Sequence, residues 1–311
     1  PTAFPGGERD VWERELFDQA YHAPEVKAHD RPKYGSLQLF PFSDGPSPRF
    51  GSCYFLLKQT VLHRSTLTFG DSHLKPDIVG TIHALEPILA ALLQQVHDQG
   101  HALGIEGLAL PDFLSYLAED RHVGKGRDVS VDRGVHEGSG PTFTGWSLRY
   151  DPTEPFHTTS FGTHTVSGDV AKQPVGRVLD DYIEVQVHGP IELNKDIEKL
   201  VVDPAFRYTE TGKQLKLLCD RYGIPLQWHR GFVLHVQSVP DDFRGPTMIP
   251  LSQCIADLTG TQYLDAAAIG MAAASLHQKP EDWKAFGSPT EVLRRLRQIW
   301  HVLVRFGQIR N

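Results

Sequence analysis

The stretch DYIEVQV, from Asp181 to Val187, constrains the fold of this chain more than any other segment. Its polar and aliphatic residues alternate one by one, which is typical of a β-strand with one face against an apolar core. A carboxylate in the middle of such a strand faces either solvent or a cleft. The two faces carry Tyr182, Glu184 and Gln186, and Ile183, Val185 and Val187.

Short apolar or alternating runs, separated by Gly, Pro and Ser, predict further strands earlier in the chain. They are expected at 36–42, 52–58, 65–69, 143–150 and 161–166, with the first three in one sheet. Apolar residues at helical spacing predict helices between and before these strands. The helices are expected at 7–21, 82–98 and 111–119.

Helical patterns dominate after Pro190. We expect helices at 194–202 and 211–222, one or two strands within 226–236, and four helices within 248–306, the last capped near Thr290. The chain is therefore predicted to be an α+β protein in three parts. These parts are an N-terminal helical segment (1–30), a core (31–193) and a mostly helical C-terminal region (194–311) packed on the core.

Composition argues against several classes of protein. A net charge of −7 over 311 residues gives no global attraction to nucleic acid, although a local basic cleft leaves such a partner open. No apolar stretch approaches the roughly 20 residues that span a bilayer, so no membrane partner is expected. The three cysteines include no CxxC pair, which argues against a disulfide scaffold. We expect a soluble protein in a reducing, cytoplasmic setting.

The sixteen histidines leave a metal-dependent function open. Imidazole is a common metal ligand, but no HExxH helix or other zinc spacing is present. A metal-assisted hydrolase or nuclease using His136, His157 and His164 with acidic partners is therefore an alternative, and no metal site is assigned.

Three short motifs carry residue types that recognise polar ligands. The first is Arg31-Pro-Lys-Tyr34-Gly35-Ser36, which enters the first predicted strand and is followed by Arg49. Its cations suit phosphates, and its glycine allows a ligand to approach the backbone. The second is Ser65-Thr66, whose hydroxyls can orient a sugar or a carboxylate. The third is the Glu184 face, which also carries Gln186 and His188.

The order of these motifs resembles that of the ADP-ribosyltransferase superfamily, in which an Arg or His is followed by Ser-Thr-Ser or Tyr and then by Glu. This resemblance covers residues 31–190. The segments RPKYGSL, RFGSCYF, TFGDS, YIEVQVHGP and QWHRGF also resemble, over nearly the whole chain, a largely bacterial domain-of-unknown-function family, number 3626.

The superfamily resemblance implies a split β-sandwich, with flanking helices and here a helical C-terminal extension, that binds NAD as a co-substrate. It implies that Glu184 is the catalytic glutamate, that Ser65 and Thr66 bind the ribose and this glutamate, and that Arg31 or Arg49 supports the ribose and phosphates. Tyr34, Gly35 and Ser36 would form the nicotinamide-binding turn. Gln186 and His188 would complete the cofactor-binding set, with His188 as a base for the acceptor.

The implied function is an NAD-dependent ADP-ribosyltransferase, or a glycohydrolase, acting as a toxin or effector that is delivered into a target cell. The hydroxyl motif departs from the superfamily pattern because Leu67 follows Ser65-Thr66. Tyr182 stands two residues before the glutamate, where many relatives that modify protein side chains have Glu or Gln. The acceptor is therefore an unidentified macromolecule, protein or nucleic acid, or a small molecule. A non-catalytic binding protein is a further alternative.

Overall fold

A computed structural model describes residues 6–27, 29–40, 42–118 and 178–309. The chain divides into two compact units, 1–110 with 171–311, and 111–170. Most of the second unit lies outside the described residues, as do the strands predicted at 143–150 and 161–166. The site and the fold described below belong to the first unit, except for a helix at 110–118 that lies almost wholly in the second unit.

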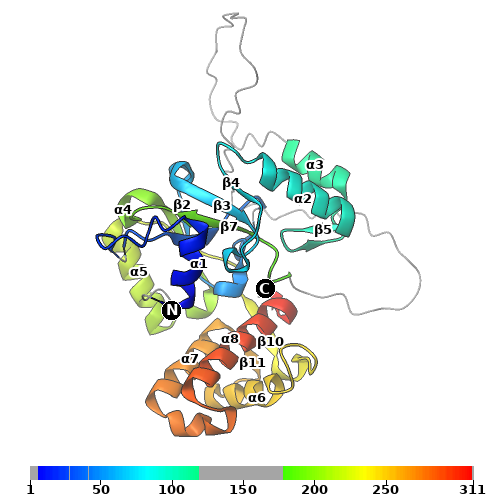
Figure 1. Ribbon diagram of the computed structural model, residues 1–311. Helices are drawn as coiled ribbons and strands as arrows, with labels where there is room; N and C mark the ends of the chain where they lie inside the picture. The colour runs from blue at the N-terminus through cyan, green and yellow to red at the C-terminus, as the bar shows by residue number, and fades with distance from the viewer. Residues whose placement is uncertain (1–5, 28, 41, 119–177, 310–311) are drawn as a thin grey trace, which may run out of the picture. The chain divides into compact units, whose positions relative to one another are not determined.

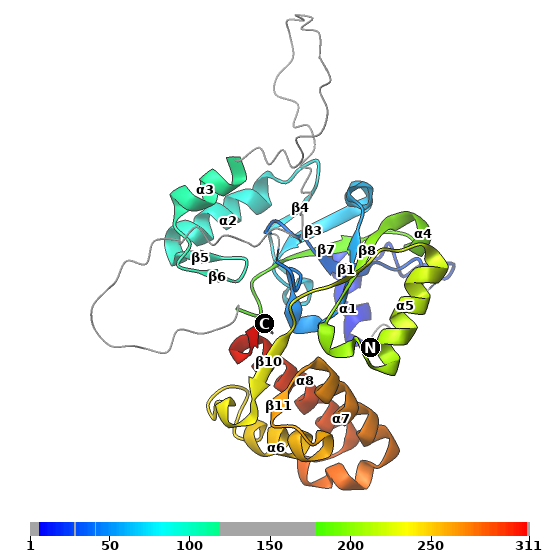
Figure 2. The same ribbon diagram turned by 180° about the vertical axis from the view of Figure 1, so that it is seen from behind.

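The main sheet has four antiparallel strands in the order β1-β7-β3-β4. β3, β4 and β7 are labelled in Figure 1, and Figure 2 also labels β1. Their bounds are β1 Lys33–Ser36, β7 Ile183–Val187, β3 Ser65–Phe69 and β4 Val79–Thr81. The predictions of β7 and β3 are confirmed. The strand predicted at 36–42 is wrong, because β1 ends at Ser36 and the following Phe40 and Phe42 line an apolar pocket instead.

A second sheet has the order β2-β8-β9, from Tyr54–Leu57, Ile197–Val202 and Leu226–Trp228. The strand predicted at 52–58 therefore exists. The prediction that it shares a sheet with β3 is wrong. The helix predicted at 194–202 is also wrong. Only Leu193–Asp196 is helical (α4), and the apolar Ile197–Val202 run forms the central strand of this sheet, with its last three residues buried. β-Branched residues favour such a buried strand over a helix.

The helices of the first unit cover these sheets. α1 (Glu8–Leu16) contacts the short 3-10 turn that follows β3, and α2 (Glu86–Gln99) packs on β3 and β4. α5 (Glu210–Tyr222) places Cys219 against the buried side chains of β8. The predicted helices at 82–98, 111–119 and 211–222 are confirmed as α2, α3 and α5. The remaining short elements are β5 His101–Ala102, β6 Ile105–Glu106, α3 Leu110–Ala118, and the 3-10 turns Pro48–Phe50 (η1), Gln59–Arg64 (η2), Ser72–Leu74 (η3), Pro204–Phe206 (η4) and Val236–Ser238 (η5).

The C-terminal helices enclose a second apolar core, and Figure 2 shows α6, α7 and α8 packed together. The four predicted helices are α6 Met248–Thr259, α7 Ala266–Gln278, the 3-10 helix Pro280–Phe286 (η6) and α8 Pro289–Phe306, beside a small sheet of β10 Phe232–His235, β11 Tyr263–Leu264 and β12 Gln308–Ile309. The capping box of α8 uses Ser288 with Glu291, not Thr290.

The first unit is thus a mixed α+β structure with small open sheets, and its described residues form no closed barrel. None of the helices in the described ranges is long and apolar enough to cross a membrane.

Gly212 is the position at which this packing is least tolerant of a side chain. A Cβ added there would lie 2.0 Å from the carbonyl oxygen of Phe206. We expect Gly212→Ala to lower the free energy of unfolding by about 1–3 kcal/mol, because the α5 backbone must shift. Urea denaturation measures this change, with the exposed Thr211→Ala as the matched control. Equal stability of the two variants would contradict the packing described.

Candidate functional site

Glu184 is flanked in register by hydroxyl residues from both neighbouring strands. It pairs with Ser36 of β1 and with Thr68 of β3. Directly opposed residues of adjacent strands project to the same face of a sheet. The backbone therefore gathers two hydroxyls and a carboxylate on one face, in the middle of the sheet.

This face is buried rather than solvated. Glu184 is 5% exposed, and all five residues of β7 are buried although every second one is polar. Buried polar groups have to be hydrogen-bonded within the protein. The alternation in the sequence thus marks two packed faces, one apolar and one hydrogen-bonded.

A continuous hydrogen-bond chain runs along the polar face. The Gln186 amide donates to Glu184 Oε1 at 2.9 Å and to Thr68 Oγ1 at 3.0 Å. Gln186 Oε1 accepts from Thr66 Oγ1 at 3.0 Å, and the same Thr66 oxygen lies 3.0 Å from His188 Nε2. His188 Nδ1 in turn lies 2.5 Å from the hydroxyl of Tyr21.

The direction of this chain follows from the number of protons available. The single hydroxyl proton of Thr66 goes to Gln186, so His188 Nε2 has to donate to Thr66. His188 Nδ1 is then the acceptor for the Tyr21 hydroxyl. This assigns a neutral imidazole with its proton on Nε2, in agreement with burial, which lowers the pKa of His188. All the bonds point from Tyr21 toward Glu184.

Burial also raises the pKa of Glu184 above the ordinary value for a glutamate. The hydrogen-bond donors of Ser72 and Gln186 act in the opposite direction, and the negative charge of Asp71 adds to the rise. Ser72 Oγ is close enough to influence the carboxyl group but makes no hydrogen bond of standard geometry. The site therefore holds a buried carboxyl group with an elevated pKa, which is a feature of functional sites.

The loop after β3 supplies polar groups that the sequence motifs do not indicate. Asp71 accepts a hydrogen bond of 2.9 Å from the Tyr182 hydroxyl, and burial together with Asp71 raises the pKa of this tyrosine. Phe50 packs edge-on against the Tyr182 ring, with a centroid distance of 5.6 Å. The adjacent Arg49 forms an ion pair with Asp180. Arg49 therefore lies beside the Tyr182 end of the Glu184 face.

Ser65 lies away from this group. It pairs with Val187, and thus lies on the apolar face of the sheet, where its hydroxyl donates to the Val61 carbonyl at 2.8 Å. Thr66 and Thr68 carry the hydroxyls that face Glu184. Within Ser-Thr-Leu-Thr, the second and fourth residues therefore share a face with the carboxylate, and the first does not.

Arg31 is engaged by the N-terminal helix. Its guanidinium is buried and pairs with Asp10 at 2.9 Å and with Glu13 at 2.5 Å. Tyr34 also donates to Glu13, at 2.9 Å, and its ring lies beneath the Arg9 guanidinium. In this structure the Arg31 side chain therefore contacts two carboxylates of α1, and the Tyr34 side chain contacts a carboxylate and a guanidinium group of α1.

One N-terminal segment thus contacts three of the predicted site residues. α1 holds Arg31 and Tyr34, and Phe17 and Tyr21 pack against the His188 ring with centroid distances of 5.3 and 5.9 Å. We refer to residues 8–22 as the N-terminal cover.

The remaining predicted residues lie on β1. Ser36 shares a hydrogen bond of 2.5 Å with Ser47. Gly35 is exposed, and a Cβ built there would meet no atom within 4 Å. Packing therefore does not require a glycine at this position, and the strand backbone is open to close approach from that side.

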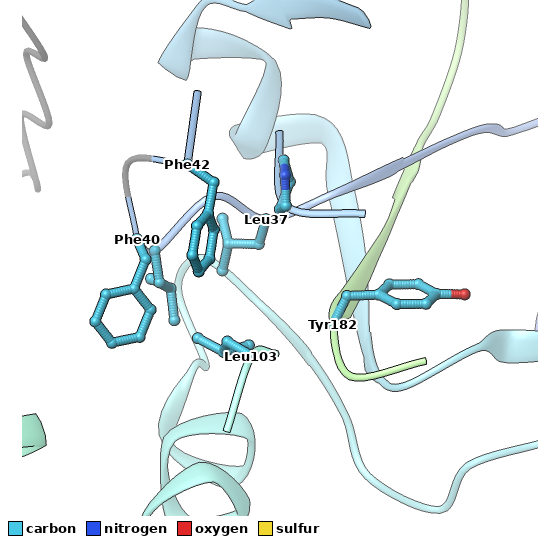
Figure 3. A pocket seen from close by; sticks show the side chains of 7 residues that line it. Leu37, Phe40, Phe42, Leu103 and Tyr182 are labelled. Carbon is cyan, nitrogen blue, oxygen red and sulfur yellow. The ribbon is translucent and has the colours of Figure 1, made fainter. Parts of the chain in front are cut away.

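A small apolar pocket lies beside Tyr182 (Figure 3). The phenyl rings of Phe40 and Phe42 and the side chains of Leu37 and Leu103 line it, and the Tyr182 hydroxyl points away from them. The pocket has room for about one water molecule, so it is not itself a nucleotide site.

No group of three or more His, Cys, Asp or Glu residues with metal-binding geometry occurs among the described residues. His136, His157 and His164 lie outside them, so the metal-dependent alternative stays a prediction. All three cysteines are free.

Comparison with known proteins identifies the family of this chain. A family model described as a protein of unknown function, DUF3626, matches residues 2–131 and 158–306. The chain belongs to this family. No curated protein matches it.

The role of Arg31 in this structure can be tested by its removal. Arg31→Met leaves Glu13, which has no solvent exposure, without its main partner. We expect the free energy of unfolding to fall by about 3–5 kcal/mol, as for other broken buried ion pairs. Thermal and urea unfolding measure the loss, with the exposed Lys27→Met as the control. An Arg31 variant as stable as the Lys27 variant would argue that this ion pair does not stabilise the fold.

Proposed function

We propose that this protein is an NAD-dependent ADP-ribosyltransferase with Glu184 as its catalytic glutamate. The observation that carries the proposal is the placement of a buried, hydrogen-bonded carboxyl group between Ser36 and Thr68 on one face of the sheet. The strand that follows Arg31, the Glu184 strand and the Ser/Thr strand are neighbours in one sheet, with the Glu184 strand between the other two. The split β-sandwich and its NAD cleft are part of this proposal.

In the proposed reaction the bond between the ribose C1′ and the nicotinamide nitrogen breaks, and nicotinamide leaves with the bonding electron pair. Positive charge develops on the ribose, and a carboxylate beside the 2′-hydroxyl stabilises that charge more than it stabilises the ground state. An acceptor nucleophile then bonds to C1′ and loses its proton. If the acceptor is water, the same chemistry is NAD hydrolysis.

The hydrogen-bond chain gives each polar residue a positioning role. Gln186 donates a hydrogen bond to one oxygen of Glu184 and so fixes the orientation of the carboxyl group. Thr66 and His188 fix the orientation of Gln186. The Gln186 amide also donates a hydrogen bond to Thr68. A carboxylate fixed in this way loses little orientational freedom when the reaction begins.

The N-terminal cover has to move before a dinucleotide can reach this face. Glu13 occupies the Tyr34 hydroxyl and, together with Asp10, the Arg31 guanidinium. Displacement of these carboxylates would free a cation and an aromatic ring for phosphate and nicotinamide, which are the roles that the superfamily resemblance implies.

Release of nicotinamide from NAD by the purified full chain tests the proposal. We expect Glu184→Gln to abolish release and Glu198→Gln, on the exposed side of β8, to leave it unchanged. Because burial raises the pKa of Glu184, the rate should rise with pH as this carboxyl group ionises above the ordinary range for glutamate. The assay is run with and without a cell extract, which separates transfer from hydrolysis. No release under either condition, with no NAD binding, would refute the proposal, whereas binding without release would favour a binding protein.

Two variants of β3 test whether the hydroxyl of Thr68, and not that of Ser65, supports the Glu184 site. Thr68→Val removes the acceptor of the Gln186 amide, so we expect kcat to fall by about 10²-fold with little change in KM. Ser65→Ala removes a hydroxyl on the opposite face and should leave kcat within about twofold of wild type. A larger loss from Ser65→Ala than from Thr68→Val would reverse this assignment.

A further inference from the structure

Two exposed histidines lie side by side just before the start of β3 and just after the end of β4. His63 Nδ1 is 3.1 Å from His83 Nε2. The ring centroids are 5.1 Å apart and the ring planes are inclined by 27°, so the two nitrogens lie on the facing edges of nearly parallel rings. Both residues are exposed to solvent. The pair therefore presents one nitrogen of each ring to the same point, and that point is accessible from solvent.

The pairing of β3 with β4 brings these two residues together. Thr66 pairs with Thr81, and the same antiparallel register continued along both segments places His63 opposite Ala84, the neighbour of His83. Two backbone hydrogen bonds between Thr81 and Ala84, of 3.1 and 3.2 Å, fix the turn that carries His83. The position of this imidazole is thus set by the end of the sheet.

The turn that carries His63 is fixed as well. The Val61 side chain is buried, and the Val61 carbonyl accepts a hydrogen bond from Ser65 Oγ at 2.8 Å. The guanidinium group of the adjacent Arg64 pairs with Asp196 at 2.9 Å, which offsets the cation nearest in sequence to His63. Because the backbone is held at both histidines, little conformational entropy is lost when a ligand joins the two rings.

We propose that His63 and His83 bind one divalent transition-metal ion of the class that prefers imidazole, such as Zn²⁺, Ni²⁺ or Cu²⁺. Two nitrogens bound to one tetrahedral zinc ion at about 2.0–2.1 Å lie about 3.3 Å apart. The two histidine nitrogens are already 3.1 Å apart, so a small rotation of the exposed rings brings both onto one ion. Water completes the coordination, because the part of the chain that the structure describes supplies no group of three or more ligands.

The metal ion takes the place of one proton between the two rings. In the hydrogen bond of the metal-free pair, one of the facing nitrogens carries a proton and the other accepts it. On metal binding this proton moves through water to the other nitrogen of the same ring, and both facing nitrogens then ligate the ion as neutral imidazoles. Protons therefore compete with the metal ion, and the affinity should fall as the pH is lowered.

Calorimetric titration of the full chain with Zn²⁺ near neutral pH tests this inference. We expect a weakening of about 10²-fold in each of His63→Gln and His83→Gln, because a single imidazole forms no chelate. The double variant should bind within about twofold of either single variant, since the two side chains act as one unit. His97→Gln is the matched control, because His97 is also exposed and its ring contacts Asp98 at 2.8 Å instead of a second imidazole.

NMR spectra locate the bound ion, because Zn²⁺ should shift the imidazole signals of His63 and His83 and leave those of His97 in place. Absence of Zn²⁺ binding by wild type would overturn the inference. Equal weakening by the His63 and His97 variants would also overturn it, because it would indicate adventitious ions on surface histidines only. Mg²⁺ prefers oxygen ligands and should not displace Zn²⁺. The inference does not depend on the proposed reaction at Glu184.

Discussion

Burial of β7 on both faces is the constraint on which the main sheet depends. One face packs against aliphatic side chains, so the other has to satisfy a carboxyl group and an amide without bulk water. The strands on either side supply the hydroxyls for this, and Tyr21 completes the chain of bonds. The buried polar residues of β7 thus require hydrogen-bonding side chains at the facing positions of the adjacent strands.

The N-terminal cover contains a second buried carboxyl group, that of Glu13. Glu13 is fully enclosed, and donors on three side chains, those of Arg9, Arg31 and Tyr34, compensate its charge. Such a cluster gives little net stability compared with an apolar core, but removal of one partner is expensive. It therefore fixes the position of α1 on the sheet more than it strengthens the fold.

Sequence alone predicts the α+β class, the family, most helices and the two central strands of the main sheet. It predicts Glu184 as the centre of a polar face because period-two alternation is a local property. It does not reveal that Ser65 lies on the face opposite Glu184, because register decides which residues share a face and register depends on distant partners. It also misses Tyr21 and Asp71, which reach the site only through tertiary contacts, and it reads Ile197–Val202 as helical because a short apolar run fits either structure.

The cover has a kinetic consequence if the face beneath it binds a substrate. Opening this face separates Arg31 from two carboxylates and breaks the Tyr21–His188 bond in the same motion. An event of this kind occurs as a unit and is slow compared with side-chain rotation. The rate of turnover would then be limited by access, and dissolved salt would accelerate it by screening the separated charges.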